Sequence, residues 1–213
     1  MRPGSAWMAA ALVVAVCGAA AGQEEHNPRY VPDETRVVLL PVANVSGEKD
    51  AKQRSLQAEN GKRELVKRFA ERGFRLAEPR TIRRALDDLH ADLSGEERLR
   101  REELERVGRA LEADLAVYVE ITDVSQQLNQ NLFSKTREGK AKIRMWILDV
   151  ARGAPLLNGV VLEGSSTGGH FGELEKGSRR IVLAVANGIR HLLEPILKPY
   201  PVVERAHRER AGD

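Results

Sequence analysis

The sequence predicts one mixed α/β domain, in which helices pack on a five-stranded sheet in the order β-α-β-α-α-β-β-β-α. In the first half, short apolar runs alternate with segments whose apolar residues recur every three or four positions, which is typical of parallel strands joined by helices. In the second half, three consecutive segments alternate apolar and polar residues, which is typical of an antiparallel meander. A long amphipathic segment closes the domain.

The first strand, helix and second strand follow from punctuated apolar patterns. The run Arg36–Val42 is compact, apolar and bounded by turn-forming residues, so we expect a buried strand. Apolar residues at helical spacing over 56–70 predict a helix, and Gly73 stands where a glycine C-cap is expected. Residues 74–77 predict a short strand that Pro79 closes.

Two further helices are expected before the meander. The first begins at Thr81 and carries isoleucine and leucine on one face as far as Leu93. Ser94 and Glu97 have the spacing of a capping box, which predicts the start of a second helix that continues to Leu111.

The second half of the domain is predicted from a change of period. Alternation over 115–122 and 143–148, followed by the apolar run 156–163, predicts three adjacent antiparallel strands. We expect a loop over 164–180, and then a helix over 181–196, whose isoleucines, valines and leucines share one face. Hydrophobic residues make up 42% and charged residues 31% of the chain, which is a globular profile.

The first 22 residues form the pattern of an export signal. Arg2 precedes an uninterrupted apolar run at 8–21, and the charged residues 23–25 follow. The run is too short and too rich in small residues to span a membrane, so it predicts a secretory signal peptide cleaved after Ala21 or Gly22. No later apolar run is long enough for a membrane span. We therefore expect a bacterial periplasmic protein.

The remaining boundaries follow from composition. Residues 23–35 are polar with two prolines and are predicted to be a linker, 36–198 form the domain, and 199–213 form a polar tail.

One short motif matches a catalytic signature. Residues 164–168 read G-x-S-x-G, which would make Ser166 a nucleophile with His191 or His207 as its base. A nucleophile elbow leads straight into its helix, whereas more glycines follow Gly168. We therefore expect a strand-to-helix loop here, and an exported serine hydrolase stays as an alternative.

Other chemistries have little support in the sequence. The five histidines are scattered, so we expect no metal and no cofactor. Basic residues are interleaved with acids at a net charge of +3, so we expect no nucleic-acid partner. The exception is Trp146 on the polar face of its strand, which is either a protein-interface anchor or covered by the last helix. With Arg144 and Tyr118 on the same and the neighbouring strand, it is the candidate binding surface.

Four stretches carry a family resemblance. They are RVVLLPVANVSG (36–47), ELVKRFAERGFRLAEPRTIRRAL (64–86), VGRALEADLAVYVEITDV (107–124) and AKIRMWILDVARGAPLLNGVVLEGSS (141–166). Together they resemble the periplasmic domain shared by the curli secretion-channel subunit CsgG, the LpoB activators of penicillin-binding proteins and the amino-terminal domain of TolB. The resemblance covers roughly 36–197 and implies a non-catalytic domain that binds proteins at the inner face of the outer membrane.

The chain departs from these families in two places. The connection at 125–139 is too short for the membrane-inserting hairpins of the curli channel subunit, which argues against a pore. The activators are lipoproteins, and a lipid anchor at Cys17 would need a small residue before the cysteine, where Val16 stands. The sequence therefore favours cleavage after Ala21 or Gly22, which removes Cys17, over an anchored form at the outer membrane.

The sequence thus predicts a non-catalytic periplasmic accessory protein that contacts another envelope protein. The hydrolase at Ser166 is one alternative. A component that binds a small ligand or a glycan in the cleft between sheet and helices is another.

Overall fold

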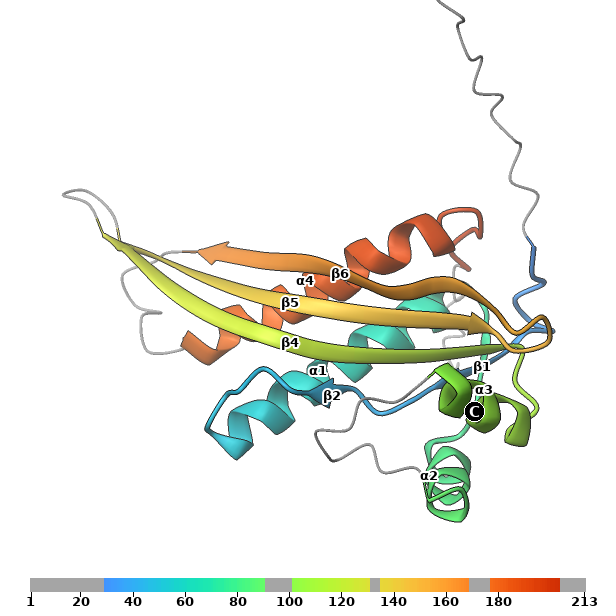
Figure 1. Ribbon diagram of the computed structural model, residues 1–213. Coiled ribbons are helices and arrows are strands. Elements are labelled where there is room, and N and C mark those ends of the chain that lie inside the picture. The colour runs from blue at the N-terminus through green and yellow to red at the C-terminus, as the bar shows by residue number, and fades with distance from the viewer. Residues whose placement is uncertain (1–28, 91–100, 131–134, 169–176, 204–213) are drawn as a thin grey trace, which may run out of the picture.

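The computed structural model describes residues 29–90, 101–130, 135–168 and 177–203 and shows a six-stranded mixed sheet with four helices (Figure 1). The predicted signal peptide with Cys17, Ala21 and Gly22, and the predicted capping box at Ser94, lie outside these ranges. The elements are β1 (Arg36–Leu39), β2 (Ala43–Asn44), α1 (Ala51–Glu71), β3 (Arg75–Leu76), α2 (Pro79–Asp88), α3 (Arg101–Ala110), β4 (Leu115–Gln130), β5 (Lys135–Asp149), β6 (Ala154–Gly168) and α4 (Gly177–Leu197).

The sheet has the strand order β3-β1-β4-β5-β6, with β2 paired to β4. The first three strands of this order are parallel, and β4, β5 and β6 form an antiparallel meander, which confirms the predicted mixed α/β fold. The number of strands differs from the expected five. The predicted strand over 36–42 is interrupted at Pro41, which has no N–H for a ladder hydrogen bond, and the chain pairs with β4 again at Ala43 and Asn44.

The three meander strands are longer than their apolar patterns predict. β4 has 16 residues, and β5 and β6 have 15 each. Main-chain pairing continues through polar stretches, from Gln130 opposite Lys135 to Arg137 opposite Gly168. The loop expected at 164–168 is therefore wrong, because these residues belong to β6.

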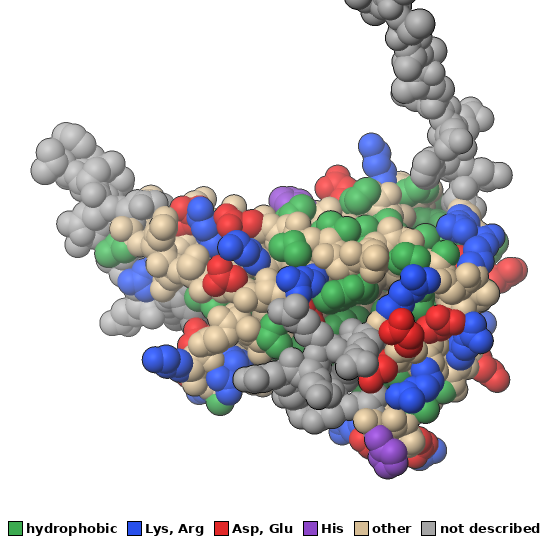
Figure 2. Space-filling model, in the orientation of Figure 1, with side chains coloured by type: hydrophobic (Ala, Val, Ile, Leu, Met, Phe, Trp, Pro, Cys, Tyr) green, Lys and Arg blue, Asp and Glu red, His purple; other side chains and the backbone are tan. Residues whose placement is uncertain are grey.

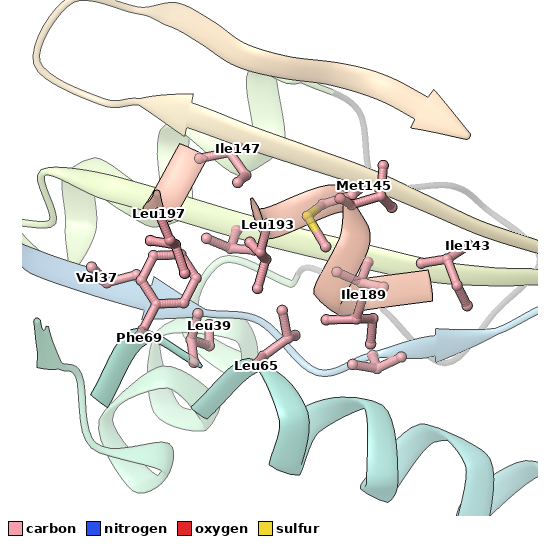
Figure 3. Close-up of a cluster of buried hydrophobic side chains, with 14 of the residues drawn as sticks. Val37, Leu39, Leu65, Phe69, Ile143, Met145, Ile147, Ile189, Leu193 and Leu197 are labelled. Carbon is pink, nitrogen blue, oxygen red and sulfur yellow. The ribbon is translucent and has the colours of Figure 1, made fainter. Parts of the chain in front are cut away.

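Helices α1 and α4 cover one face of the sheet and enclose the larger core. Figure 3 shows Phe69 of α1 and Leu193 of α4 in the same buried cluster as the β5 side chains Ile143, Met145 and Ile147. All five are at most 1% exposed. At about 25 cal/mol per Å² of buried apolar surface, burial of these side chains stabilises the domain.

The opposite face is only partly covered. Helices α2 and α3 bury Val38 of β1, Leu40 just after it, Ala116 of β4 and Leu148 of β5. In Figure 1 these two helices lie over one end of the sheet, and no described helix lies over β5 and β6 on this side. Side chains of β5 and β6 on this face are therefore not packed under any described helix in the way that the opposite face is packed under α1 and α4.

Parts of the predicted linker and tail contact the domain. The hydroxyl of Tyr30 donates to Asp149 Oδ2 at 2.8 Å, and the N–H of Tyr30 donates to the hydroxyl of Tyr200 at 3.2 Å. The N–H of Val203 donates to the carbonyl of Glu71 at 2.8 Å. The described segments that flank the domain are thus held together at one end of the sheet. Of the helices in the described ranges, none is both long and apolar enough to cross a membrane.

Candidate functional site

The structure brings the three predicted site residues together on the partly covered face. Tyr118 of β4 is paired in register with Trp146 of β5, and their rings stack with centroids 5.4 Å apart at 28°. Arg144 lies two residues before Trp146, so its side chain is on the same face. Its guanidinium carbon is 5.9 Å from the centre of the Trp146 ring, within reach of a cation–π interaction.

The three residues differ in how accessible they are. Tyr118 is 2% exposed, whereas Trp146 is half-buried and a quarter of the Arg144 side chain is exposed. A partner would therefore contact Trp146 and Arg144, while Tyr118 supports the indole from below. Cover of Trp146 by α4, the other expectation, is wrong, because α4 packs on the opposite face of the sheet.

Glu120 completes the support of this cluster and was not expected from the sequence. It is fully buried, two residues after Tyr118 on the same face of β4. Its Oε1 accepts from the Tyr118 hydroxyl at 3.4 Å, and its Oε2 lies 3.5 Å from Nη1 of Arg144. A buried carboxylate needs such partners, so Glu120 fixes the position of Arg144. The alternation in 115–122 places it on this face, but only the strand pairing shows its partner.

A bulge in β6 shapes the same surface. Gly159 has φ +66° where the register between β5 and β6 shifts, and its main chain lies against the Trp146 ring. Val161 follows, opposite Arg144 in register, and is 49% exposed. We name Trp146, Arg144 and Val161 together the Trp146 surface. It combines a half-buried aromatic ring, a positioned cation and an exposed valine.

Further along β5, charged side chains on this face pair across the strands. Lys142 lies 3.4 Å from Asp123 of β4, and Lys140 lies 3.5 Å from Glu163 of β6. Figure 2 shows basic and acidic side chains interspersed with hydrophobic ones on the face turned to the viewer. Such mixed charge does not create the single-sign field that binds a polyanion.

Ser166 does not have the geometry of a nucleophile elbow. It lies in β6 opposite Gly139, is 9% exposed and is on the face that packs against α4. An elbow requires a sharp strand-to-helix turn that exposes the serine hydroxyl. His191 is exposed on α4, and His207 lies outside the described residues.

Gly164, the first glycine of the G-x-S-x-G match, has a packing role instead, as does Gly139 on the neighbouring strand. A Cβ on Gly164 would lie 2.8 Å from Cα of Gly188 in α4, closer than real Cβ contacts allow. A Cβ on Gly139 would lie 2.7 Å from the N–H nitrogen of Ile181. These glycines therefore let α4 approach the main chain of β5 and β6.

Apart from the Trp146 surface, the structure has a cleft between α1, α2 and the ends of β1 and β3. It is a cleft of about 200 Å³ with mostly apolar walls and with Lys62 and Arg83 as its charged residues. Among the residues that the structure describes, no aromatic or amide side chain lines it, so these walls offer a glycan neither a stacking ring nor an amide hydrogen bond. Within the described ranges, no cluster of three or more histidine, cysteine or acidic residues could hold a metal ion.

The chain is similar to several solved structures at low identity. A hypothetical protein from Chlamydia trachomatis has 16% identity and a TM-score of 0.45 over 76% of this chain and 95% of its own. A lipoprotein from Neisseria meningitidis has 16% identity and a TM-score of 0.41 over 74% and 99%. The LpoB C-terminal domain from Salmonella enterica has 15% identity and a TM-score of 0.37 over 64% and 84%.

All three TM-scores lie below 0.5, so neither the fold nor the function of this chain is inferred from these likenesses. No family model matches the sequence, and no curated protein matches it. An LpoB domain is thus among the distant structural matches of this chain. The resemblance to the curli channel subunit and to TolB stays a prediction.

Proposed function

We propose that this chain is a non-catalytic accessory protein of the bacterial cell envelope that binds another protein through the Trp146 surface. One observation carries the proposal: a half-buried tryptophan stands on the face where no described helix lies over β5 and β6, stacked on Tyr118 and flanked by Arg144. Tryptophan, tyrosine and arginine are the residue types that dominate the binding energy of protein interfaces.

The support beneath the surface favours protein binding over simple core packing. Arg144 is held by the buried Glu120, and Trp146 is held between Tyr118 and Gly159, so both side chains lose little freedom when a partner binds. The exposed Val161 extends the apolar area on the adjacent strand. Mixed charges around the cluster would form the polar rim of such an interface.

A cross-linking experiment tests the surface. A photoreactive phenylalanine analogue replaces Val161 in the full chain in its own bacterium, with Leu56 of α1 as the matched position, because it is 41% exposed and α1 packs on the opposite face of the sheet. We expect one protein to cross-link from position 161 and not from position 56. Equal cross-links from both positions, or none from position 161, would contradict the proposal.

Affinity measurements with the cross-linked protein then separate binding from folding. We expect Val161→Glu to raise the dissociation constant at least tenfold, which is about 1.4 kcal/mol. Leu56→Glu should leave it unchanged. Because both residues are exposed apolar residues, neither variant removes core packing.

The envelope location is a proposal from the sequence of the first 22 residues. The expected mature protein begins at Gly22 or Gln23 and is released with the periplasmic fraction. N-terminal sequencing and intact mass test this directly. A mature chain that begins with an acylated Cys17 would replace the soluble form with a lipid-anchored one.

The cleft beside α2 favours a second candidate function, the binding of an apolar anion. Its walls are apolar, and Lys62 and Arg83 supply positive charge. The probe is 8-anilinonaphthalene-1-sulfonate, which has apolar rings and one sulfonate. Fluorescence enhancement that disappears with Arg83→Glu would support this function, and binding that persists in that variant would exclude the cleft.

A further inference from the structure

The outer edge of β6 is a possible template for another strand. β6 is the last strand in the sheet order, and among the described strands it pairs with β5 alone. In an antiparallel pair, successive residues alternately bond to the neighbouring strand and point away from it. A strand of 15 residues therefore presents a row of outward N–H and C=O groups.

Parts of this row are already bonded or interrupted. Nδ2 of Asn187 donates to the carbonyl of Ser165 at 2.8 Å, and Nη1 of Arg180 donates to the carbonyl of Thr167 at 3.4 Å. Near the start of β6, Pro155 has no N–H and Gly159 interrupts the ladder. Prolines, bulges and covering side chains are the means by which proteins protect sheet edges.

One window between these features stays open. Val161 and Glu163 lie four and two residues before Ser165, so their main-chain groups point in the same outward direction. In the ranges that the structure describes, neither residue has a hydrogen bond on this side. The window at 160–163 thus offers two N–H and two C=O groups to an added strand.

The side chains of the window indicate what it would accept. Val160 and Val161 are 42% and 49% exposed and point to opposite faces of the sheet. Glu163 already has Lys140 as its partner at 3.5 Å. An added strand would therefore place β-branched apolar residues beside both valines, where cross-strand pairs are most favourable.

The length of the window distinguishes between two occupants. Two copies of this chain that joined only through four residues would bury far less than the roughly 1,600 Å² of a stable interface. A partner protein that also contacts the Trp146 surface would bury further area there, so the small area of the window does not exclude it. Val161 belongs to both the window and the Trp146 surface, which makes the two contacts continuous.

We therefore propose that residues 160–163 of β6 pair with an extended, valine- or isoleucine-rich segment of a partner protein. This rests on the proposed function, and it adds how the partner is held: by main-chain hydrogen bonds on the edge next to the Trp146 surface.

Hydrogen exchange on the wild-type full chain tests the open edge. We expect the amides of Val161 and Glu163 to exchange freely, whereas those of Leu162 and Gly164, which bond to β5, should be protected. The probe is a displayed library of random 12-residue peptides selected on the purified chain. A selected peptide should be valine- or isoleucine-rich and slow exchange at Val161 and Glu163 at least tenfold.

Two matched variants separate the main chain from the side chain. Glu163→Pro removes an outward N–H, which an edge strand tolerates, and should weaken peptide binding more than tenfold. Glu163→Ala keeps the N–H and should bind like wild type. N-methylation of alternate peptide amides should abolish binding without any change in the protein.

Several results would overturn the added strand. They are a failure to select any peptide, equal binding by Glu163→Pro and wild type, and slow exchange of Val161 and Glu163 in the free chain. Dimerisation that disappears with Glu163→Pro would assign the window to a second copy. If Val161→Glu weakens the cross-linked partner but Glu163→Pro does not, the added strand is wrong and protein binding stands; if neither does, both are wrong.

Discussion

The main chain of Gly164 in β6 lies against Gly188 in α4, so that a Cβ on Gly164 would stand 2.8 Å from Cα of Gly188. The same Cβ would also meet the carbonyl of Ala184 in α4. Both obstacles are main-chain atoms, which cannot move aside like the end of a flexible side chain. The close approach of α4 to the sheet therefore depends on Gly164.

Gly164→Ala is expected to lower the free energy of unfolding by about 2 to 3 kcal/mol, because α4 must shift away from the sheet. Urea denaturation measures the change. Ser165→Ala is the matched control: the adjacent side chain is exposed on the other face, so its stability should change by less than about 0.5 kcal/mol. Equal stability of Gly164→Ala and wild type would refute the close contact.

Gly159→Ala is expected to affect both the main chain and Trp146. An alanine at φ +66° costs about 1 to 2 kcal/mol. Its Cβ would also lie 3.1 Å from Nε1 of Trp146 and displace the ring. Gly153→Ala is the control, because Gly153 has φ +59° but no atom closer than 3.6 Å to its Cβ. We expect Gly159→Ala to lose about 1 kcal/mol more than the control in thermal or urea unfolding.

Removal of Arg144 is expected to destabilise the domain because Glu120 would lose its cation while fully buried. We expect Arg144→Met to lower the free energy of unfolding by about 2 kcal/mol. Lys142→Met removes the neighbouring cation on the same face, whose partner Asp123 is half exposed. That change should be within about 0.5 kcal/mol. Equal effects of the two variants would contradict the role of Glu120 as a buried anchor.

Asp149 is expected to make stability depend on acid pH. Burial alone would raise the pKa of Asp149, but the hydrogen bond from Tyr30, the N–H of Arg152 and the charges of Arg152 and Arg29 together lower it below its ordinary value of 3.8. A carboxyl whose pKa is lowered by folding stabilises the protein above its ordinary pKa, and this stability is lost as the pH falls through the lowered value.

The test compares wild type with Asp149→Asn by urea unfolding at several pH values. The difference in free energy of unfolding should be greatest near neutral pH and should shrink below about pH 4. Asp123→Asn, which changes a half-exposed carboxylate, should change the free energy of unfolding at neutral pH by less than about 0.5 kcal/mol. A constant difference for Asp149→Asn across the pH range would contradict the lowered pKa.

Periodicity in the sequence was enough to predict the layers of the fold. The two parallel strands with their helices, the meander and the last helix all follow from where apolar residues recur. The same pattern placed Tyr118, Arg144 and Trp146 on one face of adjacent strands. The pattern alone could not show whether a helix covers these three side chains, because that depends on the face of the sheet against which α4 packs.

Other features depend on the main chain and left no apolar pattern. The ends of β4, β5 and β6 are polar, and their pairing is held by hydrogen bonds that any side chain permits. The glycines at 164 and 168 suggested a loop, whereas Gly164 serves a close helix contact. The sequence places Tyr30 in a linker. Its hydrogen-bond partner Asp149 lies 119 residues away, so no local pattern indicates the contact.

The hydrogen bond between Tyr30 and Asp149 also sets where the N-terminal segment leaves the domain. Asp149 ends β5 three residues after Trp146, a distance of about 10 Å along the strand. If the chain is attached through its N-terminus, the Trp146 surface lies near the place where that segment joins the domain. The end of β5 at Lys135 then points away from the attachment. The length of chain before Tyr30 would then set the distance between the point of attachment and the Trp146 surface. Lengthening that segment would increase this distance without altering the domain.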